Sequence, residues 1–347
     1  MRTLSRRTAT TLSRRRFLRA SSAAAGALVV PAFAPRGLLG QTAPSHRVVV
    51  GCIGMGEHGV NRNLSLLLAQ PDAEVAAVCD VFASRRETAR SIVETRYSKG
   101  GCGTYADFRR IIERKDIDAV MISTPDHWHV LMSVLAIRAG KDVICEKPTF
   151  TIHEGRVLCE AVKRHKSVFQ TSTEDRSLPC YHQMAQIVRN GLIGKVRTVR
   201  VQLPAGDRFP DEEPVPVPEG LDYDLWLGPA PQAPYTPSRT ERQHWRNCRD
   251  YSGGKLTDWG MHQLDTVQWA LDVERTGPVE VEGKGTVSPG STYNTFVDYE
   301  IAYRYSSGIE VHVRSGGTGL RFEGEAGWVG NQQFAGPVEA SSKEILA

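Results

Sequence analysis

The sequence lacks the features that are typical of disulfide-rich, membrane-spanning and repeat proteins. None of the seven cysteines forms a C-x-x-C pair, and an odd number does not suit a framework of disulfides. After residue 34, no apolar run approaches the roughly 18 residues of a membrane-spanning helix. Neither an internal repeat nor a low-complexity tract is present. We therefore expect free thiols, and a mature chain that does not insert stably into a membrane.

Acidic residues are missing from the first 34 positions, which hold arginines at positions 2, 6, 7, 14, 15, 16 and 19. Residues 13–19 match the twin-arginine export pattern, and a small apolar run over 20–30 and an Ala-Phe-Ala cleavage-like site follow. We expect a twin-arginine signal peptide over 1–34, a linker over 35–45 and a periplasmic or otherwise exported protein. A disordered basic N-terminus is the plainer alternative. Removing the seven leader charges from the net charge of +4 leaves −3, so nucleic acid is not an expected partner.

A glycine pattern, G-x-G-x-x-G, follows a β-branched run over residues 46–53 and provides Gly54, Gly56 and Gly59. A helix is predicted over 60–69 and a second strand over 74–79, which ends at Asp80. The glycines would let backbone N–H groups approach a pyrophosphate, and Asp80 would accept a hydrogen bond from a ribose 2′-OH. A tight turn without a ligand is the alternative.

The carboxylate of Asp80 also bears on the choice of cofactor. A 2′-phosphate would meet a like charge there, which favours NAD over NADP. Arg85 and Arg86 follow closely and offer an offsetting charge, so NADP stays open.

Strands and helices alternate from residue 46 to about 175, and helices then give way to consecutive strands. The alternation predicts an α/β fold that begins with a Rossmann domain over 46–175, a doubly wound parallel sheet with helices that include 83–97, 105–114, 129–139 and 152–165. Residues 176–347 are expected to form an α+β domain with a mainly antiparallel open sheet. A proline-rich stretch over 210–237 predicts a stiff loop at a functional site.

Three polar segments carry reactive side chains. Residues 123–129 follow one predicted strand, and Glu146, Lys147 and Pro148 follow another. Asp258 and His262 are spaced i, i+4 and share one face of a predicted helix. Because open α/β sheets bind ligands at the carboxyl ends of their strands, we expect the first two segments to meet there.

Together these segments resemble the glucose-fructose oxidoreductase/inositol dehydrogenase (Gfo/Idh/MocA) family. The family order T-P-x3-H-x6-A-x3-G-K-x-V-x2-E-K-P is matched by Thr124, Pro125, His129, Ala136, Gly140, Lys141, Val143, Glu146, Lys147 and Pro148. The pair Asp258-x3-His262 resembles the catalytic pair of the inositol dehydrogenase branch. The resemblance covers residues 48–329 and implies a nicotinamide dinucleotide, a sugar or cyclitol substrate and a homo-oligomer that pairs through the open sheet.

Oxidation of a secondary alcohol needs a base for the hydroxyl proton while hydride moves to the nicotinamide. His262 suits that role, with Asp258 to orient it or relay the proton. Lys147 would stabilise the negative charge that develops on the same oxygen.

The residues expected to bind the cofactor lie in the glycine turn and at the strand ends: Gly54, Gly56, Glu57, His58, Gly59, Asp80, Thr124, Pro125, His127, His129, Glu146 and Lys147. Aromatic rings stack on sugars and arginines donate to hydroxyls, which selects as substrate candidates Trp128, Arg176, Tyr181, His182, Trp245 and Arg246.

Each of these residues also has a plainer interpretation. Lys147 would be a surface lysine, Asp258 an acidic residue of a helix's first turn, and His262 a packed histidine. His127 and Trp128 would only close a loop. A metal held by Asp258, His262 and Asp265 is a further alternative, but we predict none, because the usual two-histidine or cysteine-bearing set is missing.

The sequence therefore predicts an exported NAD(P)-dependent oxidoreductase that moves hydride between a sugar or cyclitol and a tightly bound cofactor. One alternative is an NAD-dependent glycoside hydrolase or lyase that works by transient ring oxidation and elimination. Another is a catalytically silent sugar-binding protein. The charged residues 173–176 depart from the family and suggest a shifted substrate. Because family members continue beyond the segment that resembles residues 322–329, we expect the second domain to be truncated at its C-terminus.

Overall fold

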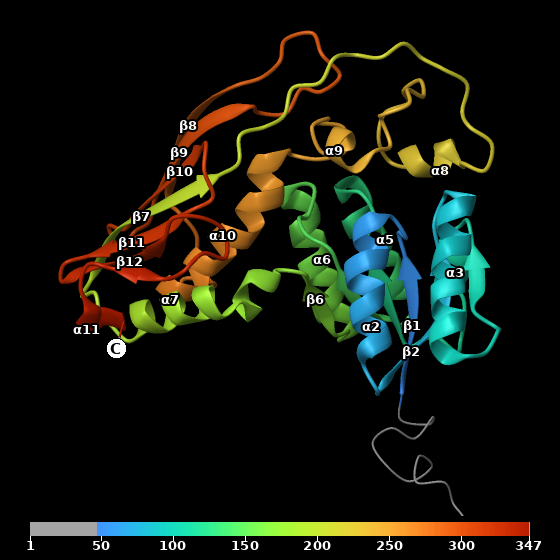
Figure 1. Cartoon of the computed structure of the whole chain (residues 1–347), viewed down its shortest axis with the longest axis horizontal. Helices are drawn as coiled ribbons and strands as arrows, with labels where there is room; N and C mark the ends of the chain where they lie inside the picture. Colours follow the sequence, from blue (N-terminus) through green and yellow to red (C-terminus); the bar gives the residue numbers. More distant parts are fainter. Residues whose placement is uncertain (1–46, 347) are drawn as a thin grey trace, which may run out of the picture. The chain divides into compact units, whose positions relative to one another are not determined.

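The computed structural model describes residues 47–346, and the predicted signal peptide and linker lie outside this range (Figure 1). Residues from Val48 onward belong to one compact unit. Among the described residues, no helix is both long enough and apolar enough to cross a membrane. All seven cysteines are free, as expected.

Six parallel strands form the first sheet, in the order β3-β2-β1-β4-β5-β6. They are β1 (Val48–Ile53), β2 (Ala73–Cys79), β3 (Gly103–Tyr105), β4 (Ala119–Ile122), β5 (Asp142–Cys145) and β6 (Phe169–Thr171). The central strands are apolar and buried because helices cover both faces. This order confirms the predicted Rossmann sheet.

The helices of this part are η3 (Gly59–Leu64), α2 (Ser65–Ala69), α3 (Ala83–Tyr97), α4 (Arg109–Ile112), α5 (Asp126–Arg138) and α6 (Ile152–His165). The predicted helix over 105–114 was wrong at its start, because Tyr105 pairs with Cys79 at the sheet edge. Helix α5 begins three residues before the predicted 129. Pro125 precedes it in extended conformation, and Asp126 stands in its first turn.

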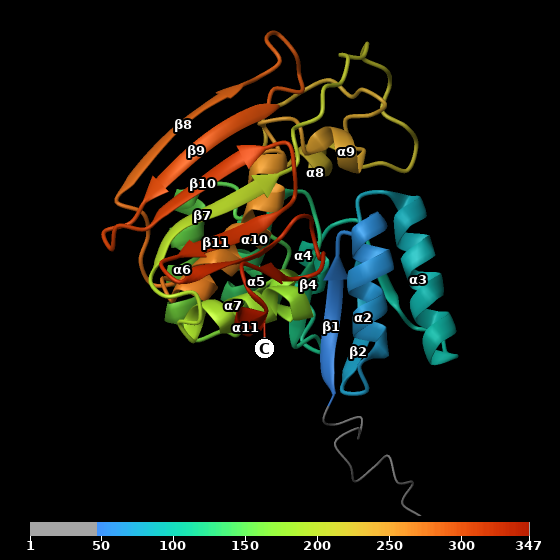
Figure 2. The ribbon, with the colours of Figure 1, turned by 60° about the vertical axis from the view of Figure 1, so that its left-hand side comes forward.

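Seven strands form the second sheet, in the order β13-β12-β11-β7-β10-β9-β8 (Figure 2). They are β7 (Val196–Leu203), β8 (Glu280–Thr286), β9 (Asp298–Arg304), β10 (Glu310–Ser315), β11 (Leu320–Gly324), β12 (Gly327–Asn331) and β13 (Glu339–Ala340). Only β7 and β10 pair in parallel, which confirms the prediction of a mainly antiparallel sheet.

Two helices, α7 (Pro179–Arg189) and α10 (Lys255–Leu271), cover one face of the second sheet (Figure 2). The short 3-10 helix η4 (Glu174–Ser177) leads into α7 and contacts α10. The sequence after residue 330 has no strong helical or strand pattern. These residues nevertheless form β13 and helix α11 (Lys343–Leu346), whose Ile345 packs into the same core.

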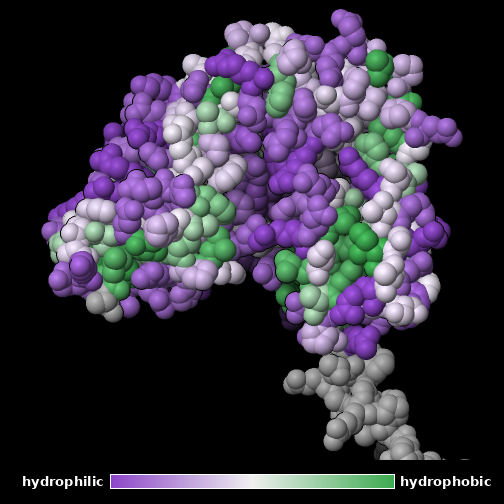
Figure 3. Space-filling model, in the orientation of Figure 1, coloured by the Kyte–Doolittle hydropathy of each residue, from purple (hydrophilic) through white to green (hydrophobic). Residues whose placement is uncertain are grey.

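A long connection over residues 204–254, here named the strap, leaves β7 and returns across the carboxyl ends of the Rossmann strands (Figure 1). It contains α8 (Tyr223–Leu227) and α9 (Arg242–Trp245). Backbone hydrogen bonds join it to the segment between β2 and α3: Ala83 N donates to Gly220 O at 2.8 Å, and Asp222 N donates to Val81 O at 3.1 Å. Around the centre of the face in Figure 3, hydrophilic residues predominate.

Candidate active site

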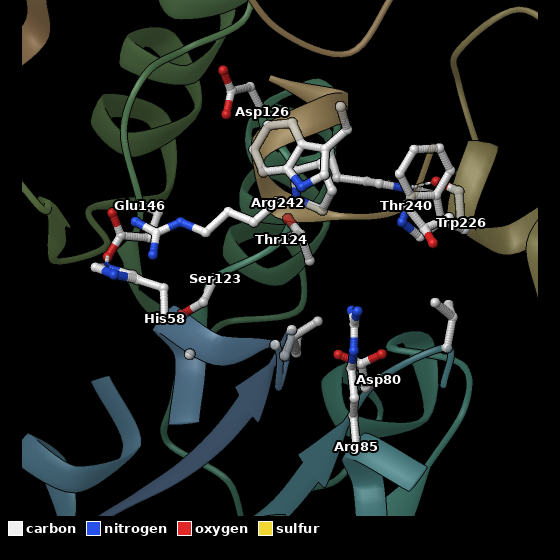
Figure 4. Close-up of a pocket in the computed structure, with 18 of the residues that line it drawn as sticks. His58, Asp80, Arg85, Ser123, Thr124, Asp126, Glu146, Trp226, Thr240 and Arg242 are labelled. Carbon is white, nitrogen blue, oxygen red and sulfur yellow. Dashed lines mark hydrogen bonds and ion pairs between the residues drawn. The ribbon is translucent and has the colours of Figure 1, made fainter. Parts of the chain in front are cut away.

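A cavity lies between the carboxyl ends of the Rossmann strands and the strap. Of the residues predicted to bind the cofactor, all but His127 line it. Further lining residues come from both sides, and Figure 4 shows several of them converging: Arg85, Ser123, Asp126, Trp226, Thr240 and Arg242. Sequence reasoning missed Trp226, Thr240 and Arg242 of the strap, because nothing in the sequence indicates where a 51-residue connection returns.

The glycine turn is required by close backbone approaches. Gly54 has φ +88°, and a Cβ there would lie 2.6 Å from the backbone of Ser123. A Cβ on Gly59 would lie 2.0 Å from the carbonyl oxygen of Gly54. Gly56 instead borders open space, with Arg85 Nη1 as its nearest neighbour at 3.7 Å. The turn therefore leaves room at Gly56 for a phosphate group to approach the backbone.

Asp80 stands at the end of β2 with its carboxylate held by the backbone. Its Oδ2 accepts from Met55 N at 2.7 Å and its Oδ1 from Phe82 N at 2.9 Å. Burial raises the pKa of this carboxyl. Arg85 stacks its guanidinium over the Phe82 ring at 3.9 Å and lies beside Asp80 (Figure 4). An acceptor for a ribose hydroxyl and a neighbouring cation thus border the cavity together.

Glu146, which had no partner in the sequence prediction, joins β5 to the glycine turn. Its Oε1 lies 3.0 Å from His58 Nε2 and accepts from Asn63 Nδ2 at 2.9 Å (Figure 4). Burial alone would raise the pKa of Glu146, but the contacts with His58 and Asn63 lower it to about 2. An ionised Glu146 therefore holds His58 at the cavity wall.

Lys147 follows β5 and is 7% exposed. Its Nζ donates to Asp258 O at 2.9 Å and to the Asp258 carboxylate. Arg246 Nε lies 3.3 Å from the other carboxylate oxygen. Although burial favours the neutral acid, Arg246 and Lys147 lower the pKa of Asp258 to about 2. Lys147 thus lines the cofactor cavity and reaches α10 at the same time.

His262 has a different carboxylate neighbour from the predicted one. Both oxygens of Asp258 are engaged by Lys147 and Arg246, whereas His262 Nδ1 lies 3.6 Å from Asp175 Oδ1. The prediction that Asp258 orients His262 is therefore corrected. Burial and the charge of Lys147 lower the pKa of His262 to about 4, so the imidazole is neutral at pH 7. The only sequence signal for Asp175 was the unusual charge of residues 173–176.

Two histidines in the first turn of α5 link neighbouring segments. His129 has its ring nitrogens 2.8 Å from Pro148 O and 2.9 Å from Thr124 O, so it links two strand-end loops. His127 does not line the cavity, because its first-turn position in α5 directs it into the strap's aromatic core, 3.2 Å from Trp226 O. Its assignment as a cofactor residue is corrected, and burial lowers its pKa to about 4.

Among the substrate candidates, three line the cavity and three do not. Trp128, Trp245 and Arg246 line it, and Trp128 Nε1 donates to Trp226 O at 3.1 Å. The three remaining candidates are corrected because η4 and α7 turn towards α10 and the second sheet, and each has a partner there. These partners are the carboxylates of Asp265 and Glu274 for Arg176, the hydrophobic core for Tyr181 and the ring of Trp269 for His182.

Within residues 47–346, no cluster of three or more His, Cys, Asp or Glu side chains is arranged to hold a metal. The donor set around the cavity instead suits a dinucleotide: an open glycine turn, a ribose acceptor at Asp80, and arginines from both walls at Arg85 and Arg242.

Two segments match family models of the GFO/IDH/MocA group. Residues 48–173 match the model described as "Oxidoreductase family, NAD-binding Rossmann fold", and residues 182–330 match "Oxidoreductase family, C-terminal alpha/beta domain". The two matches together cover well over half of the chain.

Similar curated proteins include two bacterial ones. The inositol 2-dehydrogenase/D-chiro-inositol 3-dehydrogenase of Shouchella clausii is 34% identical over 155 residues, 44% of this chain and 43% of its own length. A glycosyl hydrolase family 109 protein of Saccharopolyspora erythraea is 31% identical over 209 residues, 53% of this chain and 44% of its own length. The chain spans less than two thirds of the length of curated relatives such as these.

A solved structure with the same fold is the aldose-aldose oxidoreductase from Caulobacter crescentus complexed with glycerol. It has a TM-score of 0.64 and 20% sequence identity, and the match covers 85% of this chain and 83% of that one. At that identity the likeness concerns the fold alone.

Proposed function

The chain belongs to the GFO/IDH/MocA family of oxidoreductases, and on this premise we propose that it transfers hydride between a secondary alcohol of a sugar or cyclitol and a tightly bound NAD. NAD supplies the hydride acceptor when bound at the Rossmann domain. The rest of the chemistry is assigned to the chain's own side chains.

The position of Lys147 carries this proposal. Lys147 lines the cofactor cavity and also contacts α10, where His262 lies. An alcohol oxygen beside the Lys147 ammonium would have its developing negative charge stabilised. The Asp258 carboxylate, which also pairs with Arg246, holds that ammonium in place.

His262 is the base of the proposed reaction. Its pKa of about 4 keeps the imidazole unprotonated at pH 7, so it can take the hydroxyl proton while hydride leaves the same carbon. In the reverse direction, the imidazolium returns this proton to the alkoxide. Asp175, the nearest carboxylate, stands behind His262 and is itself buried.

Retention of the cofactor is supported by the strap, which adds Trp226, Arg242 and Trp245 to the cavity wall. Release of a dinucleotide would require the strap to lift, and several contacts oppose this. Ser252 Oγ donates to Asp126 Oδ2 at 2.6 Å, and His127 N donates to Tyr251 O at 3.2 Å. These contacts lie at the start of α5, directly over the carboxyl end of β4.

Export is part of the proposal, because residues 1–34 carry the twin-arginine pattern. An exported enzyme meets little free NAD and must recycle the molecule that it carries. We therefore propose that one sugar is oxidised and another carbonyl compound reduced at the same site. We also propose a homo-oligomer that pairs through the open face of the second sheet, which light scattering of the purified protein would test.

A second candidate function is hydrolysis of a glycoside by transient oxidation and elimination. The similarity to the glycosyl hydrolase family 109 protein favours it. The same base and the same NAD would serve, since oxidation of a ring carbon acidifies the neighbouring C–H bond. A catalytically silent sugar-binding protein is the remaining alternative.

One experiment separates these functions. The purified protein is denatured, and the released nucleotide is identified by mass spectrometry. The intact protein is then supplied with free sugars, cyclitols and aryl glycosides. Reduction of the bound NAD by a free sugar or cyclitol supports the oxidoreductase, whereas aglycone release without net NADH supports the hydrolase. Absence of bound nucleotide would rule out the retained-cofactor mechanism.

A further inference from the structure

Asp175 is a buried carboxylate with no hydrogen-bond donor among the residues that the structure describes. The residue is 0% exposed, and neither Oδ1 nor Oδ2 has a partner. His262 Nδ1 is also buried and without a partner, and it lies 3.6 Å from Asp175 Oδ1. Burying a carboxylate without a hydrogen-bond donor costs folding free energy. Its presence beside the proposed base therefore suggests a function.

The neighbours of Asp175 in η4 have other partners. Glu174 Oε1 lies 3.4 Å from Arg62, and Arg176 binds Asp265 through two hydrogen bonds of 2.6 and 2.7 Å. These contacts hold the single turn on both sides. Asp175 is left as the member of η4 that faces His262.

Asp258 is not free to accept a hydrogen bond from His262, although it lies one helical turn before it. Its Oδ1 accepts from Lys147 and its Oδ2 lies 3.3 Å from Arg246. The two carboxylates therefore have different partners: Asp258 pairs with Lys147 and Arg246, and Asp175 is the carboxylate available to the imidazole of His262.

The charges around the pair come from several elements. Lys147, after β5, and Asp265, in α10, act on both groups. Asp175 also feels Glu174 in its own turn and Arg62 in η3. His262 also feels Asp258 in its own helix and Glu146 after β5. Burial, with Glu174, raises the pKa of Asp175 to about 7, so its ionisation changes across the neutral range.

We propose that Asp175 is a positioning residue for His262. It accepts a hydrogen bond from Nδ1–H, which fixes that tautomer and leaves Nε2 free for the substrate hydroxyl. When the hydroxyl proton moves to Nε2, the resulting imidazolium keeps its Nδ1 proton, and the ionised Asp175 stabilises the new positive charge. This inference rests on the proposed function, because it assigns the base of that reaction.

The first test does not depend on turnover. The full-length protein is labelled with ¹⁵N-histidine, and the His262 signals are identified by their loss in His262→Gln. We expect a protonated Nδ1 and an unprotonated Nε2, with the Nδ1 signal shifting as Asp175 titrates near pH 7. A His262 protonated at Nε2 would overturn the proposal, even if no sugar is ever turned over.

The second test compares two substitutions at Asp175. Asp175→Asn keeps an acceptor but loses the charge, and we expect kcat to fall about 100-fold with KM little changed. Asp175→Leu removes both and should lower kcat further, without loss of stability, because a buried unpaired carboxylate is replaced by an apolar group. The matched control is Glu160→Gln, which removes one exposed carboxylate of α6 outside the site and should retain parental kcat.

The pH profile separates a positioning role from a structural one. In the parent, we expect kcat to rise with pH through about 7, as Asp175 becomes ionised. Asp175→Asn should lose this limb, and Glu160→Gln should keep it. Full kcat and an unchanged limb in Asp175→Asn would overturn the inference. Absence of turnover in the parent would instead contradict the proposed function, and the ¹⁵N signals would still decide the role of Asp175.

Discussion

The ammonium group of Lys147 donates to both the carboxylate and the carbonyl oxygen of Asp258, which lies 111 residues later in the chain. The first residue follows a Rossmann strand, and the second stands in the first turn of the helix behind the other sheet. This contact joins the wall of the proposed cofactor site to α10, the helix that also carries His262.

Replacement of Lys147 by methionine should lower kcat by about 100- to 1,000-fold, the usual loss when a charge-stabilising donor is removed. Bound NAD should remain, because the glycine turn and the strap are untouched. Steady-state kinetics and the nucleotide content of the same preparation measure the two effects. Lys284→Met, at an exposed lysine of β8, is the control and should match the parent. Undiminished turnover in Lys147→Met would remove Lys147 from the mechanism.

The stability that Asp258 provides should depend on pH in a defined direction. Its pKa is lowered from 3.8 to about 2 in the folded state, which corresponds to about 2 kcal/mol of folding free energy. This contribution is present above pH 3.8 and is lost as the pH falls towards 2. Urea unfolding should therefore show Asp258→Asn as destabilised at pH 6 and progressively less so below pH 3.8.

The exposed pair between Asp298 and Arg208, 3.6 Å apart, supplies the control for that measurement. Asp298→Asn should change the unfolding free energy by less than about 1 kcal/mol at either pH, because exposed ion pairs contribute little. Equal destabilisation by the two substitutions at pH 6 would contradict the role of Asp258 as a buried anchor.

Gly228 tests whether the strap retains the nucleotide. Its φ is +50°, and a Cβ would lie 1.9 Å from the Trp128 ring, so Gly228→Ala should push the strap away from α5. We expect bound NAD to be lost on dialysis. Gly308→Ala has a similar positive φ of +83° but no atom within 4 Å of the added methyl, so it should lose some stability and keep its nucleotide. Retention of NAD by Gly228→Ala would show that the strap is not the barrier.

Asp80 should set the preference for NAD over NADP. Asp80→Asn removes the charge that a 2′-phosphate would meet and leaves Arg85 beside the site, so the bound NADP-to-NAD ratio should rise about tenfold. Mass spectrometry of the released nucleotide measures this ratio. Asp72→Asn, at an exposed turn before β2, should leave it unchanged. An unaltered ratio in Asp80→Asn would assign the preference to other residues.

Local sequence patterns were sufficient to predict those features that depend only on neighbouring residues. The glycine turn, Asp80 and Lys147 could be identified because strand ends and tight turns impose their residues over short stretches. Helices α3 and α6 were predicted with the bounds that the structure shows, since their apolar periodicity and flanking residues are local signals.

The failures had a common origin in long-range packing. Tyr181 and Arg176 carry the residue types of a sugar site, but η4 and α7 turn them towards α10 and the second sheet. His127 lies next to lining residues, yet its position in the first turn of α5 directs it into the strap's aromatic core. Side-chain direction in these cases depends on the partner element, which residue type alone does not reveal.

The sequence by itself determined the Rossmann sheet and the glycine turn, because each follows from local spacing and hydrophobic period, whereas the roles of Lys147, Asp258 and His262 were predicted from the resemblance of their motifs to the family. Only the tertiary structure decided which carboxylate faces His262 and which segment closes the cavity. Asp175 and Asp258 are 83 positions apart in the chain, and both lie near the imidazole. Their roles differ because Lys147 and Arg246, brought in from other elements, bind Asp258 and leave Asp175 to the base.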